Sequence, residues 1–235
     1  MVPEPSVLCL VATTLRLLSW HTPNAVIMTQ QGFLEIASKI LKLADERRED
    51  ISLRAAVFDV AATVETISWV GPASEVMAHS NGTMVVGALL KYDCDSLCRS
   101  AVVALCNMAS CGGVHQMMVE EGAVGIHVHV CEKVLFSKVS SNVHQRSIIV
   151  ELRHRVTLML AYLANGLTGR KARGRMVKEG VIPYVLRLAS AKTTSLATKE
   201  VCSSVLAALS HAPNTRTLMI EQGALAAVTE LADCG

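Results

Sequence analysis

The sequence is poor in aromatic and charged residues. Only 3% of its 235 residues are Phe, Trp or Tyr and 18% are charged, whereas 51% are hydrophobic. A core must therefore be built from Leu, Val, Ala, Ile and Met, and intrinsic disorder is excluded because it requires low hydrophobicity and high net charge. Long hydrophobic runs are also missing, since stretches such as 7–18 and 201–209 end well short of the roughly 18–20 residues that cross a bilayer. The start lacks the basic segment of a secretory signal. We expect a soluble protein without a membrane span.

Sequence motifs for catalysis are missing as well. The chain has no Gly-rich phosphate loop, no Gly-x-Ser-x-Gly and no His-Glu-x-x-His. We predict that it is not an enzyme and needs no cofactor, with an enzyme of unknown type as the remote alternative.

The eight cysteines form no Cys-x-x-Cys pair, and most lie in apolar runs where cysteine acts as a small hydrophobic residue. A chain of this length does not need disulfides, so we expect a reducing compartment: the cytoplasm, with a cytoskeletal or ciliary (flagellar) setting as the narrower expectation. A metal-binding triplet is suggested by His127-Val-His129-Val-Cys131, with His144 nearby. On a helix, however, side chains two residues apart point in directions that differ by about 200°. Cys94-x-x-x-Cys98 lacks the spacing of a zinc site. We predict no metal.

The strongest pattern that is present is an internal repeat. An apolar run, a polar break, a short amphipathic stretch, a glycine and a second apolar run recur, as in Met118-Val-Glu-Glu-Gly122 and Met176-Val-Lys-Glu-Gly180. The junction glycines are Gly32, Gly82, Gly122, Gly180 and Gly223, with spacings of 50, 40, 58 and 43 residues. The period is near 42 with insertions, and a period of this size is typical of repeat proteins.

In each copy of the repeat, the sequence pattern predicts three helices. In one copy these are a short helix over 173–179, a second over 182–188 and a long third over 196–209, with the glycine turn between the first two. No such helix can bury its apolar face alone, but stacking on neighbouring copies creates a continuous core.

Three helices, a glycine between the first two and this period resemble the armadillo repeat. The resemblance is carried by Met/Ile-Val-x-x-Gly-x-Ile/Leu-x-x-Val/Leu, followed by a helix ending in Leu-x-Asn-Leu/Met, and it covers 6–233. HEAT repeats are the alternative, but they have two helices and lack the glycine junction. The resemblance implies an all-α, right-handed superhelical solenoid. We expect a single domain, a piece of a longer solenoid or one whose ends pack on another chain, with four full repeats at roughly 24–68, 73–109, 113–166 and 171–209 and partial repeats at both ends. The extra residues of the third repeat are placed at 136–149.

In armadillo proteins the third helices line a concave groove, and an Asn near each helix end clamps an extended peptide. Fifteen residues before the junction glycines, only Asn107 and Asn165 match. The resemblance therefore implies peptide binding by these two residues, and hydrogen bonding between repeats is the alternative. The importin-alpha subtype also needs a Trp four residues earlier, where this chain has Val103 and Ala161, so an importin-type reader of nuclear signals is not expected.

Charge is unevenly distributed along the chain. Residues 1–117 carry 8 Lys or Arg against 11 Asp or Glu, net −3, whereas residues 118–235 carry 14 against 9, net +5. Six Arg and two Lys lie between 146 and 178 against Glu151 alone. We predict one electropositive region for acidic partners, such as tubulin-like tails or acidic or phosphorylated motifs. Its residues are Arg153, Arg155, Arg170, Lys171, Arg173 and Arg175. A solvated face is the alternative, and nucleic acid is not expected because aromatic stacking residues are nearly missing from the cluster, Tyr162 being the one between 146 and 178.

Together these observations predict a non-enzymatic scaffold for protein–protein interactions. We expect a structural or adaptor subunit of a hetero-complex, such as a cytoskeletal or axonemal assembly, that binds a protein or an extended peptide. The alternatives are a myosin-chaperone-like or trafficking adaptor and a catenin- or importin-like peptide receptor.

Overall fold

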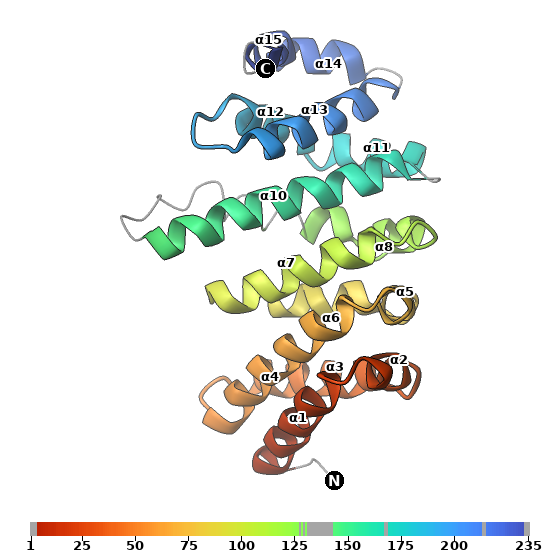
Figure 1. The fold of residues 1–235 in the computed structure, drawn as a ribbon, viewed down its shortest axis with the longest axis vertical. Coiled ribbons are helices and arrows are strands. Elements are labelled where there is room, and N and C mark those ends of the chain that lie inside the picture. The colour runs from red at the N-terminus through yellow and green to blue at the C-terminus, as the bar shows by residue number, and fades with distance from the viewer. Residues whose placement is uncertain are drawn as a thin grey trace. The chain divides into compact units, whose positions relative to one another are not determined.

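The computed structural model describes residues 4–126, 128, 130, 143–166, 169–212 and 215–232. All regular structure in these ranges is α-helical and none is a strand, so the prediction of an all-α chain is confirmed for the described residues (Figure 1). The described helices include none that combines the length and the apolar character needed to span a bilayer. The chain groups into two compact units, Met1–Val114 and His115–Gly235, which we call unit 1 and unit 2.

Unit 1 repeats one order, in which two shorter helices precede a longer one. Its helices are α1 (Pro5–Ser19), α2 (Thr22–Gln30), α3 (Phe33–Glu46), α4 (Ile51–Ser68), α5 (Gly71–His79), α6 (Gly82–Leu89) and α7 (Asp95–Ala109). The long helices α1, α4 and α7 pack in series, α2 packs on α5, and α3 packs on α6 (Figure 1). Each helix therefore lies against its counterpart in the next copy, as expected when no copy can bury its apolar face alone.

Unit 2 follows the same order. Its helices are α8 (His115–Glu120), α10 (Val143–Asn165), α11 (Gly169–Lys178), α12 (Val181–Ser190), α13 (Leu196–Ser210), α14 (Thr215–Glu221) and α15 (Ala224–Ala232). Long α10 packs on long α13, α8 packs on α11, and α12 packs on α15. Of the predicted insertion, 143–149 forms the start of α10, and 136–142 lies outside the described residues, as do His127, His129 and Cys131.

Local sequence signals mark where several of these helices begin. The Asp50 carboxylate accepts a hydrogen bond from Leu53 N (3.1 Å), and Ser195 Oγ accepts one from Thr198 N (3.3 Å), so both residues cap long helices. Helices α2 and α5 carry a proline in their first turn, where the missing N–H is not needed. These residues therefore mark the starts of helices that follow one another after short connections.

The junction between the first two helices of a copy uses a left-handed residue. Gly32, Gly122 and Gly223 have φ of 89° and Gly180 has φ of 78°. In the remaining copy the left-handed residue is Asn81 (φ 59°), so the predicted junction at Gly82 was wrong by one residue. Gly82 is instead the first residue of α6, where it approaches the Met77 backbone closely.

The left-handed conformation at the junction can be tested by a substitution at Gly180, with the same substitution at Gly174 as a matched control. At both Gly180 and Gly174 an added Cβ would meet nothing within 4 Å, but only Gly180 has positive φ. Gly180→Ala is expected to lower the free energy of unfolding by about 1 kcal/mol because alanine is strained in this conformation. Gly174→Ala, inside α11, is expected to raise it by about 0.5–1 kcal/mol. Urea denaturation followed by circular dichroism measures both, and a change of the same sign in the two variants would contradict the prediction.

The core is aliphatic, as the composition requires. Helix α7 is buried over most of its length, with Leu105 and Met108 completely enclosed, and Phe33 is the one aromatic residue among the largest fully buried side chains of the described residues. Packing of such side chains holds the long helices in position. The candidate site lies on the exposed side of long helices.

Candidate functional site

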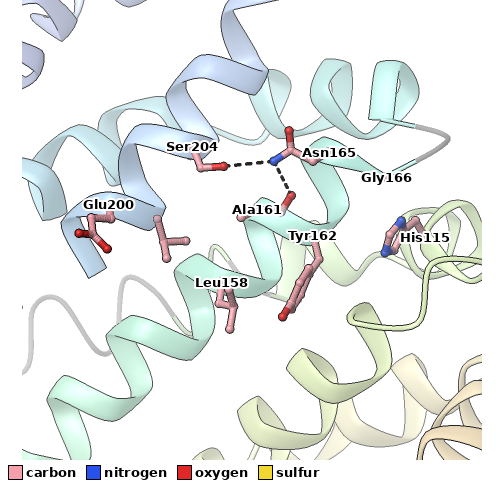
Figure 2. Close-up of a pocket in the computed structure, with 9 residues that line it drawn as sticks. His115, Leu158, Ala161, Tyr162, Asn165, Gly166, Glu200 and Ser204 are labelled. Carbon is pink, nitrogen blue, oxygen red and sulfur yellow. Dashed lines mark hydrogen bonds between the residues drawn. The ribbon is translucent and has the colours of Figure 1, made fainter. Parts of the chain in front are cut away.

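A pocket opens on the long helices of unit 2. It encloses about 480 Å³ and is lined mainly by α10 and α13, with contributions from α8 and from the residue after α10 (Figure 2). The lining residues are His115, Leu158, Ala161, Tyr162, Asn165, Gly166, Glu200, Val201 and Ser204. We call it the α10–α13 groove. Leu158, Tyr162 and Val201 supply apolar surface, and Asn165, Glu200 and Ser204 supply polar groups.

Asn165, one of the two predicted peptide-binding residues, lies in this groove. Its Nδ2 donates to the Ala161 carbonyl oxygen (3.0 Å) and to Ser204 Oγ (3.4 Å) on α13, as the dashed lines in Figure 2 show. Both amide hydrogens are therefore used within the unit, and an incoming peptide would meet Oδ1, which accepts hydrogen bonds. Asn165 can thus receive a backbone N–H from an extended chain.

Asn107, the other predicted residue, occupies the equivalent place on α7 in unit 1. Its Nδ2 donates to Ser68 Oγ (3.0 Å) at the end of α4, and that serine donates to the Glu65 carbonyl oxygen (2.7 Å). Each asparagine thus bonds to a serine on a neighbouring long helix. This geometry supports hydrogen bonding between repeats at both sites, and peptide clamping stays a prediction.

The two predicted site arginines of α10, Arg153 and Arg155, are held within unit 2. Arg153 is only 7% exposed, and its Nη1 donates to Thr193 Oγ1 (3.1 Å). Burial lowers the pKa of the Arg153 guanidinium, because the buried site disfavours its charged form, while the charge interaction with Tyr184 acts in the opposite direction. Arg155 forms an ion pair with Glu151 (2.9 Å) one turn earlier. Arg153 is therefore part of the packing of unit 2.

Helix α11 carries the other predicted basic residues. Arg170 and Lys171 are exposed, whereas Arg173 is half-buried and its Nη1 donates to the Ala164 carbonyl oxygen (2.8 Å). Arg175 pairs with Glu179 (2.6 Å). Lys171 and Arg175 also border a small pocket of about 180 Å³ shared with Glu120 of α8.

The six predicted basic residues lie at two places in unit 2. Because Arg173 contacts the end of α10 at Ala164, α11 lies near that end, and Arg153 and Arg155 lie 9–11 residues earlier. At 1.5 Å per residue this is about 14–17 Å along the helix axis. Of the six predicted residues, the exposed ones, Arg170, Lys171 and Arg175, lie on α11, and binding of an acidic partner stays a prediction.

A close approach between two elements forms one wall of the α10–α13 groove. His115 of α8 is 6% exposed, and its ring lies directly against the Cα of Gly166. An added Cβ at 166 would lie 2.6 Å from His115 Cε1 and closer still to Nδ1. Sequence reasoning missed both residues, since neither belongs to a motif.

The thiols show no arrangement for catalysis among the described residues. Burial raises the pKa of the Cys202 thiol to about 12, which keeps it protonated at neutral pH. Burial also acts to raise the pKa of Cys94 at the start of α7, but hydrogen bonds from Ser96 and from the backbone outweigh it and lower that pKa. Across the described ranges, no three His, Cys, Asp or Glu side chains are placed to hold a metal ion together.

Polar contacts that the sequence did not reveal join the long helices of unit 1. Arg16 of α1 pairs with Asp59 of α4 (2.7 Å), which also accepts a hydrogen bond from Thr13. Glu65 of α4 pairs with Arg99 of α7 (2.8 Å). No motif spacing marks these pairs, because their partners are 34–46 residues apart in sequence.

Comparisons with known proteins show a likeness of fold and no family. No family model matches the chain, and no curated protein matches its sequence. Among solved structures it is similar to an engineered protein whose crystal structure was determined by the Northeast Structural Genomics Consortium, with a TM-score of 0.66 and 18% identity over 97% of this chain and 83% of that one. At this identity the likeness shows a shared helical fold alone.

Proposed function

We propose that the chain is a non-enzymatic protein-interaction scaffold of the armadillo type, with an exposed groove on its long helices that receives an extended peptide. The observation that carries this proposal is the α10–α13 groove, which lies on the long helices where the armadillo resemblance places peptide binding. The serial packing of like helices within each unit supports the solenoid type. In this proposal the chain is a structural or adaptor subunit of a cytoplasmic hetero-complex, for which a cytoskeletal or ciliary assembly is our specific suggestion.

The chemistry of the groove suits an extended peptide. An apolar concavity with a few polar groups at its edge is the usual form of a binding site, because the apolar surface supplies affinity and the polar groups fix orientation. Leu158 and Val201 would contact an apolar side chain, while Asn165 Oδ1 would accept a backbone N–H. The exposed carboxylate of Glu200 would favour a Lys or Arg in the adjacent position.

Val201→Arg tests the groove. Peptides are first selected from a random library against the intact chain, and their dissociation constants are then measured by isothermal titration calorimetry. Because the arginine side chain would fill the concavity, we expect a loss of affinity of about tenfold or more, which corresponds to about 1.4 kcal/mol.

The matched control is Val228→Arg on α15, where the valine is 50% exposed and does not line the groove. We expect this variant to bind within about twofold of the parent chain, as remote surface changes usually do. Equal losses in the two variants, or a library that yields no binder, would contradict the proposal.

The exposed basic residues of α11 favour a second candidate, the docking of an acidic partner. The variant Arg170→Glu, Lys171→Glu, Lys178→Glu reverses three exposed charges and leaves Arg173, which bonds to α10, intact. We expect binding of a glutamate-rich peptide to weaken about tenfold at low salt and much less at 0.5 M salt, because screening already reduces the attraction there. The thermal stability should stay within about 1 kcal/mol of the parent.

The control for this variant carries the same charge change elsewhere. Lys39→Glu, Lys42→Glu, Arg54→Glu reverses three exposed charges on α3 and α4. If binding to the glutamate-rich peptide depends only on net charge, the two triple variants will weaken it equally, and α11 is then not a docking site.

A further inference from the structure

Unit 1 exposes both tryptophans of the chain. Trp20 is 64% exposed and Trp69 is 57% exposed, and each directly follows the serine that ends a long helix, Ser19 of α1 and Ser68 of α4. Large aromatic side chains carry much of the affinity at protein interfaces and are seldom left in water without a role. Their repeated position in two successive copies indicates a shared task.

The two indoles border one pocket. It encloses about 480 Å³ and lies over the ends of α1 and α4 and the starts of the helices that follow. The lining residues are Ser19, Trp20, Thr22, Ala62, Glu65, Thr66, Trp69 and Val70. We call it the tryptophan pocket. It belongs wholly to unit 1 and shares no residue with the α10–α13 groove.

The charges around the tryptophan pocket are neutralised within the unit. Glu65 Oε1 lies 2.8 Å from Arg99 Nη1, and its Oε2 accepts a hydrogen bond from Ser100 (2.6 Å). Arg16 pairs with Asp59, and its guanidinium lies 5.6 Å from the centre of the Trp20 ring. The pocket therefore complements a neutral ligand better than a cation, because Glu65, the acidic residue in its lining, is already paired.

The spacing of the indoles restricts the shape of such a ligand. Helices α1 and α4 pack side by side, and packed helices are about 8–10 Å apart. Trp20 and Trp69 follow the last residues of these two helices and border one pocket, so a ligand that touches both must match a spacing on this scale. A polyproline II helix rises about 3.1 Å per residue, so every third residue returns to the same face after about 9 Å.

We propose that the tryptophan pocket binds a proline-rich segment in the polyproline II conformation, with residues three apart lying against Trp20 and Trp69. Flat proline rings pack on indole faces, and the segment is already extended, so little conformational entropy is lost on binding. Thr66 is half-buried and uses its hydroxyl hydrogen within α4, at 2.8 Å from Ala62 O, whereas Ser19 is only 2% exposed. The Thr66 oxygen can still accept an N–H group from a non-proline residue of the segment.

Tryptophan fluorescence tests the proposal directly, because Trp20 and Trp69 are the only tryptophans in the sequence. The intact chain is titrated with a peptide that repeats Pro-Ala-Ala, with the same peptide carrying Ser in place of Pro, and with a Lys-rich peptide of equal length. We expect a saturable blue shift of the emission with the first peptide alone. Binding of the Lys-rich peptide alone, or an equal response to the Ser peptide, overturns the proposal.

Substitutions assign the response to the two indoles. Trp20→Ala and Trp69→Ala remove exposed side chains, so both variants should fold, and each should weaken binding of the Pro peptide by about tenfold in calorimetry. Met84→Ala removes a side chain that is 58% exposed on α6, outside the pocket, and should leave the affinity unchanged. A blue shift on raising the protein concentration without peptide would instead indicate that a second copy covers the indoles, which also overturns the proposal.

Discussion

Replacing Gly82 by alanine is expected to lower the free energy of unfolding by about 3 kcal/mol. Gly82 is the first residue of α6, and an added Cβ would lie 2.8 Å from the Met77 carbonyl carbon and closer still to its oxygen. It would also lie 3.1 Å from Met108 Sδ. Backbone atoms cannot rotate away as a flexible side chain can, so α5 and α6 must separate to admit the methyl group.

Gly71 provides the matched control, since it is also the first residue of a short helix, α5, but an added Cβ there would meet nothing within 4 Å. Gly71→Ala should change the stability by no more than about 0.5 kcal/mol. Chemical denaturation followed by circular dichroism gives both values. Losses of similar size in the two variants would mean that helix propensity, not the approach to Met77, determines the residue at 82.

Gly166→Ala is expected to cost about 2–3 kcal/mol and to disturb the α10–α13 groove. The added Cβ would lie 2.6 Å from His115 Cε1 and 2.8 Å from Cγ, and the ring has little room to move because His115 is 6% exposed. Since Gly166 and His115 both line the groove, the displaced ring should also weaken peptide binding there.

A double-mutant cycle with His115→Ala isolates this contact. Removing the ring removes the clash, so the double variant should be more stable than the sum of the two single effects by at least about 1 kcal/mol. Denaturation curves of the four proteins provide the coupling. Simple additivity would show that the cost at Gly166 arises from the backbone and not from the histidine ring.

The junction near residue 81 shows how far local sequence determines this fold. Asparagine and glycine both tolerate the left-handed conformation, so Asn81-Gly82 permits the turn at either residue. The spacing of the repeat indicates a junction in this place but cannot choose between neighbours. The close approach of Gly82 to Met77 decides which of the two residues makes the turn, because the first position of α6 has no room for a Cβ and must be glycine. That contact arises from the packing of α5 on α6, so the spacing of the repeat in the sequence cannot predict it.

The incorrect prediction that Arg153 lies on the surface has a different cause. Counting charges placed Arg153 in a surface region, whereas the structure buries it in the same stripe of α10 as Ile149, Val156 and Leu160. These residues recur at intervals of three and four, and this period puts them on one face of a helix. Helical periodicity could therefore have identified Arg153 as inward-facing. The pairing of Asn165 with Ser204 could not have been found in this way, since it depends on how α10 and α13 are aligned.

The packing of each long helix on its counterpart in the next copy also has a kinetic consequence. Asn107 reaches Ser68 and Asn165 reaches Ser204 across the same 39 residues, which is close to one repeat. Contact order is then low, because within a unit each copy needs only its neighbour before it can begin to order, and only short loops must close. Such a chain can nucleate at several places and can lose an outer copy while an inner one persists. Hydrogen exchange should accordingly be graded along each unit, with the slowest amides in the copies that have a neighbour on both sides.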